Sequence, residues 1–315
     1  MNAAVTAYLA DLAARRISRS RRHQSQHALS LLTTWLHEAH QIDDWRAVTE
    51  NHLRSFLVYL QRDYRSAQQR RVQAASIQNW WACIRAFCAW QQQRGRLLYS
   101  PAAAILLPQV ARVLPHVLNE SEIVRLIESP DTTTTIGLRD RALLEVLYAT
   151  GIRHGEAHRL DLFDLDLRAR RLTIREGKGQ RDRVVPLTAN ACHWLSRYLS
   201  IARPELASGQ LWGKGKSRKT RVVAAPPALW LAVTGRRFSY QMIAQIVRQY
   251  AAAAEVKANV HTFRHCCATH LLRHGADLRY IQRLLGHDRI DTTMLYTHLD
   301  LTDLQAAVAK LEPDK

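Results

Sequence analysis

The chain has 315 residues, 47% of them hydrophobic, and a formal net charge of +18 with a pI near 10.3. This length and apolar content predict a folded protein of two ordinary domains and exclude a disordered chain. No apolar run reaches the roughly 20 residues that span a bilayer, so a membrane-spanning protein is excluded too. The positive charge predicts a polyanionic partner, such as nucleic acid or an acidic membrane surface.

The charge is shared evenly along the chain, because residues 1–112 carry a net +9 and residues 113–315 carry the other +9. Both halves are therefore suited to the same polyanion. The N-terminus contains Asp11 and lacks the apolar core of a signal peptide, which predicts a cytoplasmic protein. The cysteines form no CxxC pair and are interpreted as reduced thiols. They are Cys83, Cys88, Cys192, Cys266 and Cys267.

The first hundred residues repeat apolar positions at intervals of three and four, the spacing of amphipathic helices. The fourth predicted helix begins with Ser76 as its N-cap and ends at Gly95. Prolines then punctuate the chain and favour extended backbone. We therefore expect a helical domain at 1–108 and a linker at 109–117. The four predicted helices lie at 8–17, 28–40, 52–64 and 76–95.

Residues 118–315 form a second predicted domain, in which the sequence period changes. After two helices, the segment 170–187 alternates β-branched and polar residues on both sides of GKGQ, which predicts an antiparallel hairpin with Lys178 at its tip. Helical periodicity returns at 188–201 and again from 239 onward. The expected fold is mainly α with a small antiparallel β-sheet.

Six residues carry the chemistry needed to break a phosphodiester without metal or nucleotide: Arg153, Lys178, His261, Arg264, His287 and Tyr296. The ordinary pKa of tyrosine is near 10, so a phenol attacks phosphorus only when its proton is removed and cations stabilise the phosphoryl oxygens. The two arginines can clamp non-bridging oxygens, and a lysine is a competent acid for the leaving group. His261 and Arg264 are three residues apart and share a helix face.

Each residue taken singly has a simpler interpretation. Arg153 suits an ion pair with Glu156, Lys178 an exposed turn, and His261 a structural position. Tyr296 alone does not stand out among the ten tyrosines of the chain. The hypothesis rests on the ordered set, because isolated motif matches are often false positives.

A zinc site is the main alternative for the histidine-rich segment. His261 and His265 are four residues apart, and Cys266 and His270 follow closely. These side chains do not project in one direction from a regular helix, and adjacent Cys266 and Cys267 diverge by about 100° at 3.6 residues per turn. We therefore predict neither a metal nor another cofactor.

Three sequence boxes resemble the tyrosine recombinases, a family that includes the phage integrases and the Xer proteins. They are ATGIRHGEA at 149–157, HTFRHCCATHLL at 261–272 and GADLRYIQRLLGHDRIDTTMLYTHL at 275–299. Residues 8–36 and 76–102 also resemble the helical core-binding domain of that family. The resemblance implies a two-domain site-specific recombinase, with the core-binding domain at 1–108 and the catalytic domain at 118–315.

The resemblance also assigns a role to each of the six residues. The implied roles are a phosphate clamp for Arg153 and Arg264, general acid for Lys178, proton acceptor for His261, a hydrogen bond to the phosphoryl oxygen for His287, and nucleophile for Tyr296. The nucleophile would form a 3′-phosphotyrosyl bond, which conserves the energy of the broken phosphodiester. No cofactor is implied.

The implied partner is double-stranded DNA, held between the two domains. The segment 301–311 resembles the terminal helix that family members dock into a neighbouring subunit, which implies a homo-tetramer in the synaptic complex and is consistent with a monomer in free solution. Two features depart from the family pattern. The connecting segment at 204–232 is longer and more basic than the usual connection in the family. His154 and His158 flank Arg153, and the resemblance assigns them no role.

Two other functions are compatible with these residues. A type IB topoisomerase uses a similar clamp and tyrosine to relax DNA, although the helical first domain and the Xer-like boxes favour a recombinase. A DNA-binding regulator that has lost cleavage would keep the charge, but all six catalytic positions are present.

Overall fold

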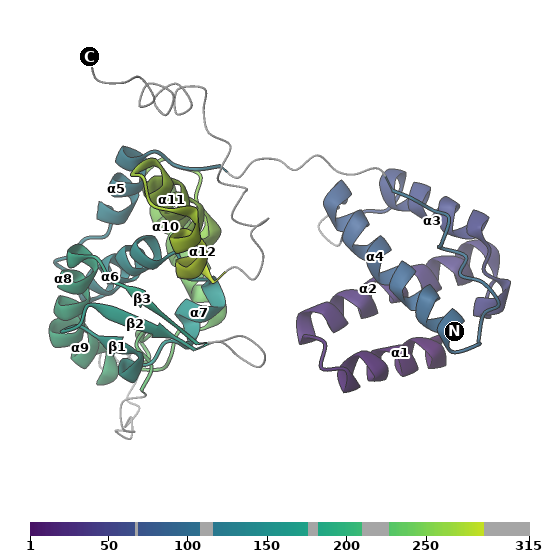
Figure 1. Ribbon diagram of the computed structural model, residues 1–315, viewed down its shortest axis with the longest axis horizontal. Helices are drawn as coiled ribbons and strands as arrows, with labels where there is room; N and C mark the ends of the chain where they lie inside the picture. Colours follow the sequence, from purple (N-terminus) through teal and green to yellow (C-terminus); the bar gives the residue numbers. More distant parts are fainter. Residues whose placement is uncertain (67–68, 108–115, 176–181, 210–226, 287–315) are drawn as a thin grey trace, which may run out of the picture. The chain divides into compact units, whose positions relative to one another are not determined.

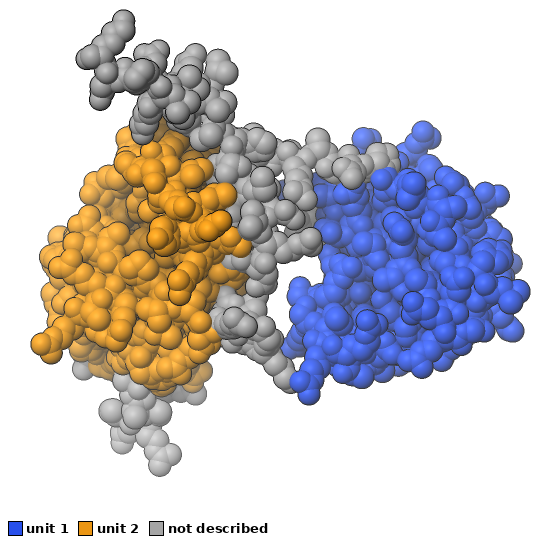
Figure 2. All heavy atoms as spheres, viewed as in Figure 1, with its two compact units in different colours: residues 1–113 blue, residues 114–315 orange. Residues whose placement is uncertain are grey.

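The computed structural model describes residues 1–66, 69–107, 116–175, 182–209 and 227–286. The chain divides into two compact units, residues 1–113 and 114–315 (Figure 2). Each unit has its own hydrophobic core. The predicted linker at 109–117 falls mostly outside the described residues.

Unit 1 is helical, and α2 packs against α1, α3 and α4 (Figure 1). Local capping fixes where several of these helices begin. Ser18 accepts a hydrogen bond from the backbone N–H of Arg21, and Thr49 forms a capping box with His52. The elements are α1 (Asn2–Ala14), α2 (Arg19–His40), the 3-10 helix η1 (Trp45–Ala47), α3 (Glu50–Arg62) and α4 (Ala74–Gln93).

Helix α4 supplies the aromatic part of the first core. Phe87 lies 4.7 Å from Trp45 between ring centroids, and Trp90 is buried beside them. Trp80 on the same helix is half-buried against His27. The prediction of Ser76 as N-cap was wrong. The helix begins at Ala74 without a side-chain cap, because two alanines, the best helix formers, extend it toward the N-terminus.

Unit 2 is mostly helical with a small antiparallel sheet of strand order β1-β2-β3, which confirms the predicted fold class. Within the described ranges, no helix is long and apolar enough to cross a lipid bilayer. The elements are α5 (Glu120–Glu128), α6 (Thr135–Thr150), α7 (His154–Arg159), η2 (Leu162–Asp164), β1 (Leu165–Asp166), β2 (Arg171–Ile174), β3 (Arg183–Pro186), α8 (Ala189–Arg197), the π-helical turn η3 (Tyr198–Ala202), α9 (Arg203–Ala207), α10 (Tyr240–Ala253), α11 (Val260–Arg273) and α12 (Leu278–Leu285).

The sheet turns one face to the core. Leu172 and Val185 are cross-strand partners and both are fully buried, whereas Val184, the preceding residue of β3, is exposed. This alternation is the period of two expected of a half-buried strand. The register places Arg183 opposite Ile174, at the end of the hairpin that leads toward Lys178. Lys178 itself lies outside the described residues.

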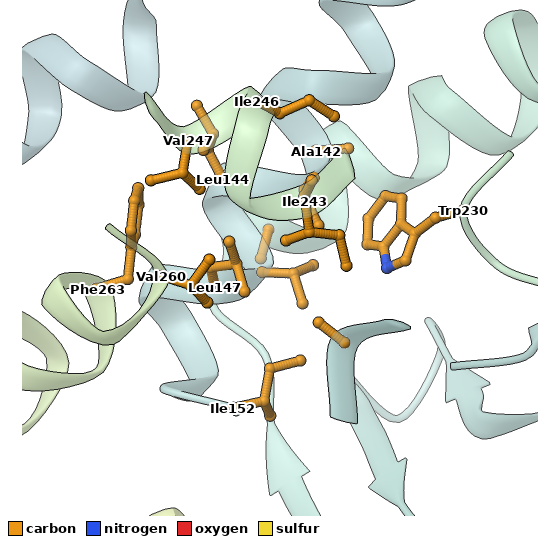
Figure 3. Close-up of a cluster of buried hydrophobic side chains, with 14 of the residues drawn as sticks. Ala142, Leu144, Leu147, Ile152, Trp230, Ile243, Ile246, Val247, Val260 and Phe263 are labelled. Atoms are coloured by element: carbon orange, nitrogen blue, oxygen red, sulfur yellow. The ribbon is translucent and has the colours of Figure 1, made fainter. Parts of the chain in front are cut away.

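Helix α6 runs through the second core. It packs against α5, α8, α9 and α11, and almost its whole length is buried. Figure 3 shows Leu144 and Leu147 of α6 among Ile243 and Val247 of α10 and Phe263 of α11. Because α11 packs directly on α6, the residues of α11 that follow His261 are brought to the C-terminal end of α6.

Candidate active site

The structure describes three of the six predicted catalytic residues. Arg153 caps the N-terminus of α7, and His261 and Arg264 lie in the first turns of α11. Lys178, His287 and Tyr296 lie outside the described residues. The described part of the site is therefore built from the ends of α6, α7, α11 and α12.

Arg264 is buried, with only 5% of its surface exposed. Its Nη1 donates to the carbonyl oxygen of Gly151 at 2.7 Å, and its Nη2 donates to the carbonyl oxygen of Leu285 at 2.7 Å. These residues end α6 and α12, where carbonyl groups have no partner within the helix and the helix dipole is negative. A buried guanidinium is thus held by the C-terminal ends of two helices.

Gly151 makes this close approach of α6 and α12 geometrically feasible. Its φ of +57° is the left-handed conformation that ends α6. A Cβ atom at this position would lie 2.6 Å from Cδ2 of Leu285 and 3.3 Å from Sγ of Cys267. A side chain here would therefore collide with the side chain of Leu285, the residue whose carbonyl oxygen binds Arg264.

Arg153 contacts the same end of α12. Its Nη1 donates to Oε1 of Glu156 at 2.8 Å, and its Nη2 donates to the carbonyl oxygen of Gly286 at 2.6 Å. The side chain of Arg153 is one-third exposed, at 33%. Since Arg264 bonds Leu285 and Arg153 bonds Gly286, the two arginines converge on consecutive carbonyl groups immediately before His287.

His261 is exposed in the first turn of α11, one helical turn before buried Arg264. It lines an open pocket of about 750 Å³, and every ionisable residue of that lining is basic. Such a pocket at the N-terminal, positive end of a helix favours an anionic ligand. The basic lining residues are His116, Arg248, Lys257, His261 and His265.

The histidines near His261 are held toward their neutral forms. Burial lowers the pKa of His265, and the charges of His261 and Arg264 lower it further. Burial also lowers the pKa of His154, with His261 and His158 contributing. The ring of His154 stacks on Tyr240 at 3.7 Å between centroids. His154, to which the sequence assigns no role, thus lies close enough to His261 for their charges to interact.

Two side chains of the zinc alternative, Cys266 and His270, form hydrogen bonds away from His261. Cys266 donates to the carbonyl oxygen of Leu118 at 3.8 Å, and Nε2 of His270 hydrogen-bonds the same oxygen at 2.9 Å. Nδ1 of His270 pairs with the hydroxyl of Tyr148. In the part of the chain that the structure describes, no group of three or more His, Cys, Asp or Glu side chains is arranged to hold a metal ion.

Two charged residues of the site were not among the predicted catalytic residues. The sequence predicts Glu156 only as an ion-pair partner of Arg153 and assigns no role to Arg183. The spacing of Arg153 and Glu156 indicated their contact, because residues three apart meet at a helix start. Arg183 gave no such signal, since its partners are 27 and 101 residues away along the chain.

The chain is similar in sequence to known proteins over most of its length. The phage integrase family model matches residues 116–302. Tyrosine recombinase XerC 2 of Ralstonia nicotianae is 35% identical over 309 residues, covering 96% of this chain and 80% of that protein. Tyrosine recombinase XerD of Xanthomonas axonopodis pv. citri is 40% identical over 233 residues, covering 73% of each.

Solved structures share the fold at lower identity. The XerH site-specific recombinase bound to difH substrate in a pre-cleavage complex matches with a TM-score of 0.68 and 21% identity, covering 95% of this chain and 82% of that one. A lambda integrase (75–356) dimer bound to a COC′ core site matches with a TM-score of 0.71 and 14% identity, covering 100% and 98%.

Proposed function

The chain belongs to the phage integrase family of tyrosine recombinases and is a site-specific recombinase, and we propose that it cuts and rejoins DNA through a covalent bond between Tyr296 and a DNA 3′-phosphate. The observation that carries this proposal is the convergence of Arg153 and Arg264 on the end of α12. Two permanent cations held side by side are suited to one phosphodiester.

The cleavage step balances without metal or nucleotide. The phenolic oxygen of Tyr296 bonds to phosphorus while the bond from phosphorus to the 5′ oxygen breaks. His261 accepts the phenolic proton, and Lys178 donates a proton to the departing 5′ oxygen. His287 hydrogen-bonds the phosphoryl oxygen. A 5′-hydroxyl reverses the same step on the phosphotyrosine, so no external energy source is consumed.

The arginines act mainly on the transition state. Negative charge grows on the non-bridging oxygens as the phosphoryl group is transferred, and preorganised donors stabilise that charge without reorganising. Arg264 is buried and fixed by two carbonyl groups, whereas Arg153 is one-third exposed beside it. Exposed His261, which lines a basic pocket, adds a surface suited to the flanking phosphates.

We further propose double-stranded DNA as the partner and a homo-tetramer as the synaptic assembly, with a monomer in free solution. The net charge of +18 supports the first proposal. The matched structures of XerH and lambda integrase are complexes with DNA, the latter as a dimer. We also propose a cytoplasmic location, because a recombinase must reach the DNA on which it acts.

The proposal is tested in two steps. Genomic fragments trapped covalently on the wild-type protein are sequenced to give the target site, and a nicked suicide substrate is then built from it. We expect wild type to form a covalent complex and Tyr296→Phe to bind the same DNA within about threefold yet form none, because phenylalanine has no nucleophilic oxygen. Covalent product from Tyr296→Phe would exclude this residue as nucleophile.

The same experiment separates the alternatives. Relaxation of a supercoiled plasmid that lacks the target site would indicate topoisomerase activity, and we expect almost none. DNA binding by wild type without any covalent product would indicate a regulator that has lost cleavage.

A further inference from the structure

Arg183 links three segments of the active site. It is the first residue of β3, and its side chain is only 11% exposed. Nη2 and Nη1 donate to the two carboxylate oxygens of Glu156 on α7, at 2.8 and 3.1 Å. Nε donates to the carbonyl oxygen of Leu284 on α12 at 3.0 Å. One guanidinium thus joins the hairpin to α7 and to the end of α12.

Arg183 completes a set of three arginines at the end of α12. The carbonyl oxygens of Leu284, Leu285 and Gly286 each accept a hydrogen bond from a different arginine. The donors are Arg183, Arg264 and Arg153 in that order. Each bond satisfies a carbonyl group that a helix end leaves without a partner. The chain is therefore held at three consecutive residues just before His287.

Glu156 connects Arg183 to Arg153. Its carboxylate is buried, and it accepts two hydrogen bonds from the Arg183 guanidinium. It accepts two more from Arg153, one from Nη1 and one from the backbone N–H, both at 2.8 Å. A carboxylate offers about four lone-pair positions. Glu156 therefore cannot turn without breaking bonds to both arginines, and the orientation of Arg153 depends on Arg183.

The charges favour the same conclusion. A buried carboxylate needs cationic partners, because transfer from water is costly. With Arg183 present, Glu156 is shared between two guanidinium groups, and Arg153 retains net attraction for a phosphate. Without Arg183, Glu156 would be balanced by Arg153 alone and would compete with the phosphate for it.

We propose that Arg183 is a positioning residue of the recombinase, which sets the orientation of Arg153 through Glu156 and fixes the end of α12 that leads to His287. This inference rests on the proposed function of Arg153 as a phosphate clamp. Arg183 need not touch DNA to act, since its guanidinium is already bonded to Glu156 and Leu284.

The test compares Arg183→Met and Arg183→Lys with wild type on the suicide substrate. The single-turnover rate constant, the fraction of protein that reacts and the Kd for DNA are measured separately. We expect Arg183→Met to lower the rate constant by about 10–100-fold, as misplaced catalytic groups do, with Kd within about threefold and an unchanged reacting fraction. Arg183→Lys should recover part of the rate, because an ammonium pairs with Glu156 but lacks the fork that also reaches Leu284.

Arg171→Met is the matched control. Arg171 lies on the neighbouring strand β2 of the same hairpin, is more than half exposed, and pairs with exposed Asp166 at 3.0 Å. The control removes the same charge at a site away from Glu156. We expect its cleavage rate to stay within about twofold of wild type, since exposed ion pairs contribute little.

A double-mutant cycle with Glu156→Gln tests whether Arg183 acts through the carboxylate. We expect Arg183→Met to lower the rate less in the Glu156→Gln background than in wild type, because the contact with Glu156 is then already weakened and the bond to Leu284 is the main one left to lose. Multiplicative losses would overturn the inference. So would a wild-type rate in Arg183→Met or, if that variant does not fold, in Arg183→Lys. If wild type itself forms no covalent complex, the proposed function fails instead.

Discussion

Replacing Gly286 with alanine would perturb the arginine set without removing any charge. Gly286 ends α12 with a φ of +64°, a left-handed conformation that alanine adopts at a cost of about 1–2 kcal/mol. Its added Cβ would also stand 3.2 Å from Cδ, Cζ and Nε of Arg183. That guanidinium would have to move by a few tenths of an ångström, away from Glu156 or Leu284.

The backbone strain and the contact with Arg183 should lower both the thermal stability and the cleavage rate. The backbone strain alone should lower the Tm of unit 2 by about 2–8 °C, at roughly 2–4 °C per kcal/mol for a domain of this size. If a comparable strain of about 1–2 kcal/mol reaches the transition state through Arg183, the cleavage rate constant should fall about 5–30-fold, since 1.4 kcal/mol corresponds to tenfold.

Gly275→Ala supplies the comparison, with both variants assayed by thermal unfolding and by single-turnover cleavage of the suicide substrate. Gly275 lies between α11 and α12 with a φ of +81°, and a Cβ atom added there would meet no heavy atom within 4 Å. It should lose similar stability but keep a cleavage rate near wild type. Equal cleavage rates for the two alanine variants would refute the idea that contact with Arg183 matters.

Three further predictions concern the same unit. Arg264→Ala should lower the cleavage rate about 100–1000-fold, as loss of a preorganised donor does, with a smaller effect on DNA affinity; a wild-type rate would remove it from the clamp. Lys257→Met, in the basic pocket, should reduce the slope of log affinity against log salt by about 0.9 if that lysine neutralises one phosphate, and an unchanged slope would exclude that contact. Burial lowers the pKa of His270 below its ordinary value of 6.5. As the pH falls below about 6.5, the unfolded chain therefore binds a proton before the folded protein does, and the folded protein loses stability. The Tm measured from pH 8 to pH 5 should fall less steeply in His270→Asn than in wild type, and equal slopes would contradict this.

Much of the fold follows from local sequence signals. Asn119 with Glu122 forms the capping box that starts α5, and Gly151 ends α6 in the left-handed conformation. The alternation around GKGQ indicated the hairpin, because strand period and turn residues are both encoded within a few positions. Ser76 shows the limit of such signals. Serine is a good capping residue, but this helix already begins at Ala74, because two helix-forming alanines precede Ser76.

The candidate site was only partly predictable. Arg153, His261 and Arg264 were identified from motifs, and the structure shows two of them bonded to the end of α12. Arg183 was missed because its contacts join strands and helices far apart in sequence, and 38 arginines in the chain make any single one uninformative. Its partners become evident only when β3, α7 and α12 are packed together.

The carbonyl groups at the end of α12 also bear on how tightly DNA can be held. An arginine side chain has roughly 2 kcal/mol of rotamer entropy to lose when it becomes ordered. Arg264 has lost that freedom during folding, since two helix ends already hold its guanidinium. In the proposed clamp, an incoming phosphate would meet a donor that is already ordered, so more of the binding free energy would remain to distinguish the transition state from the intact strand.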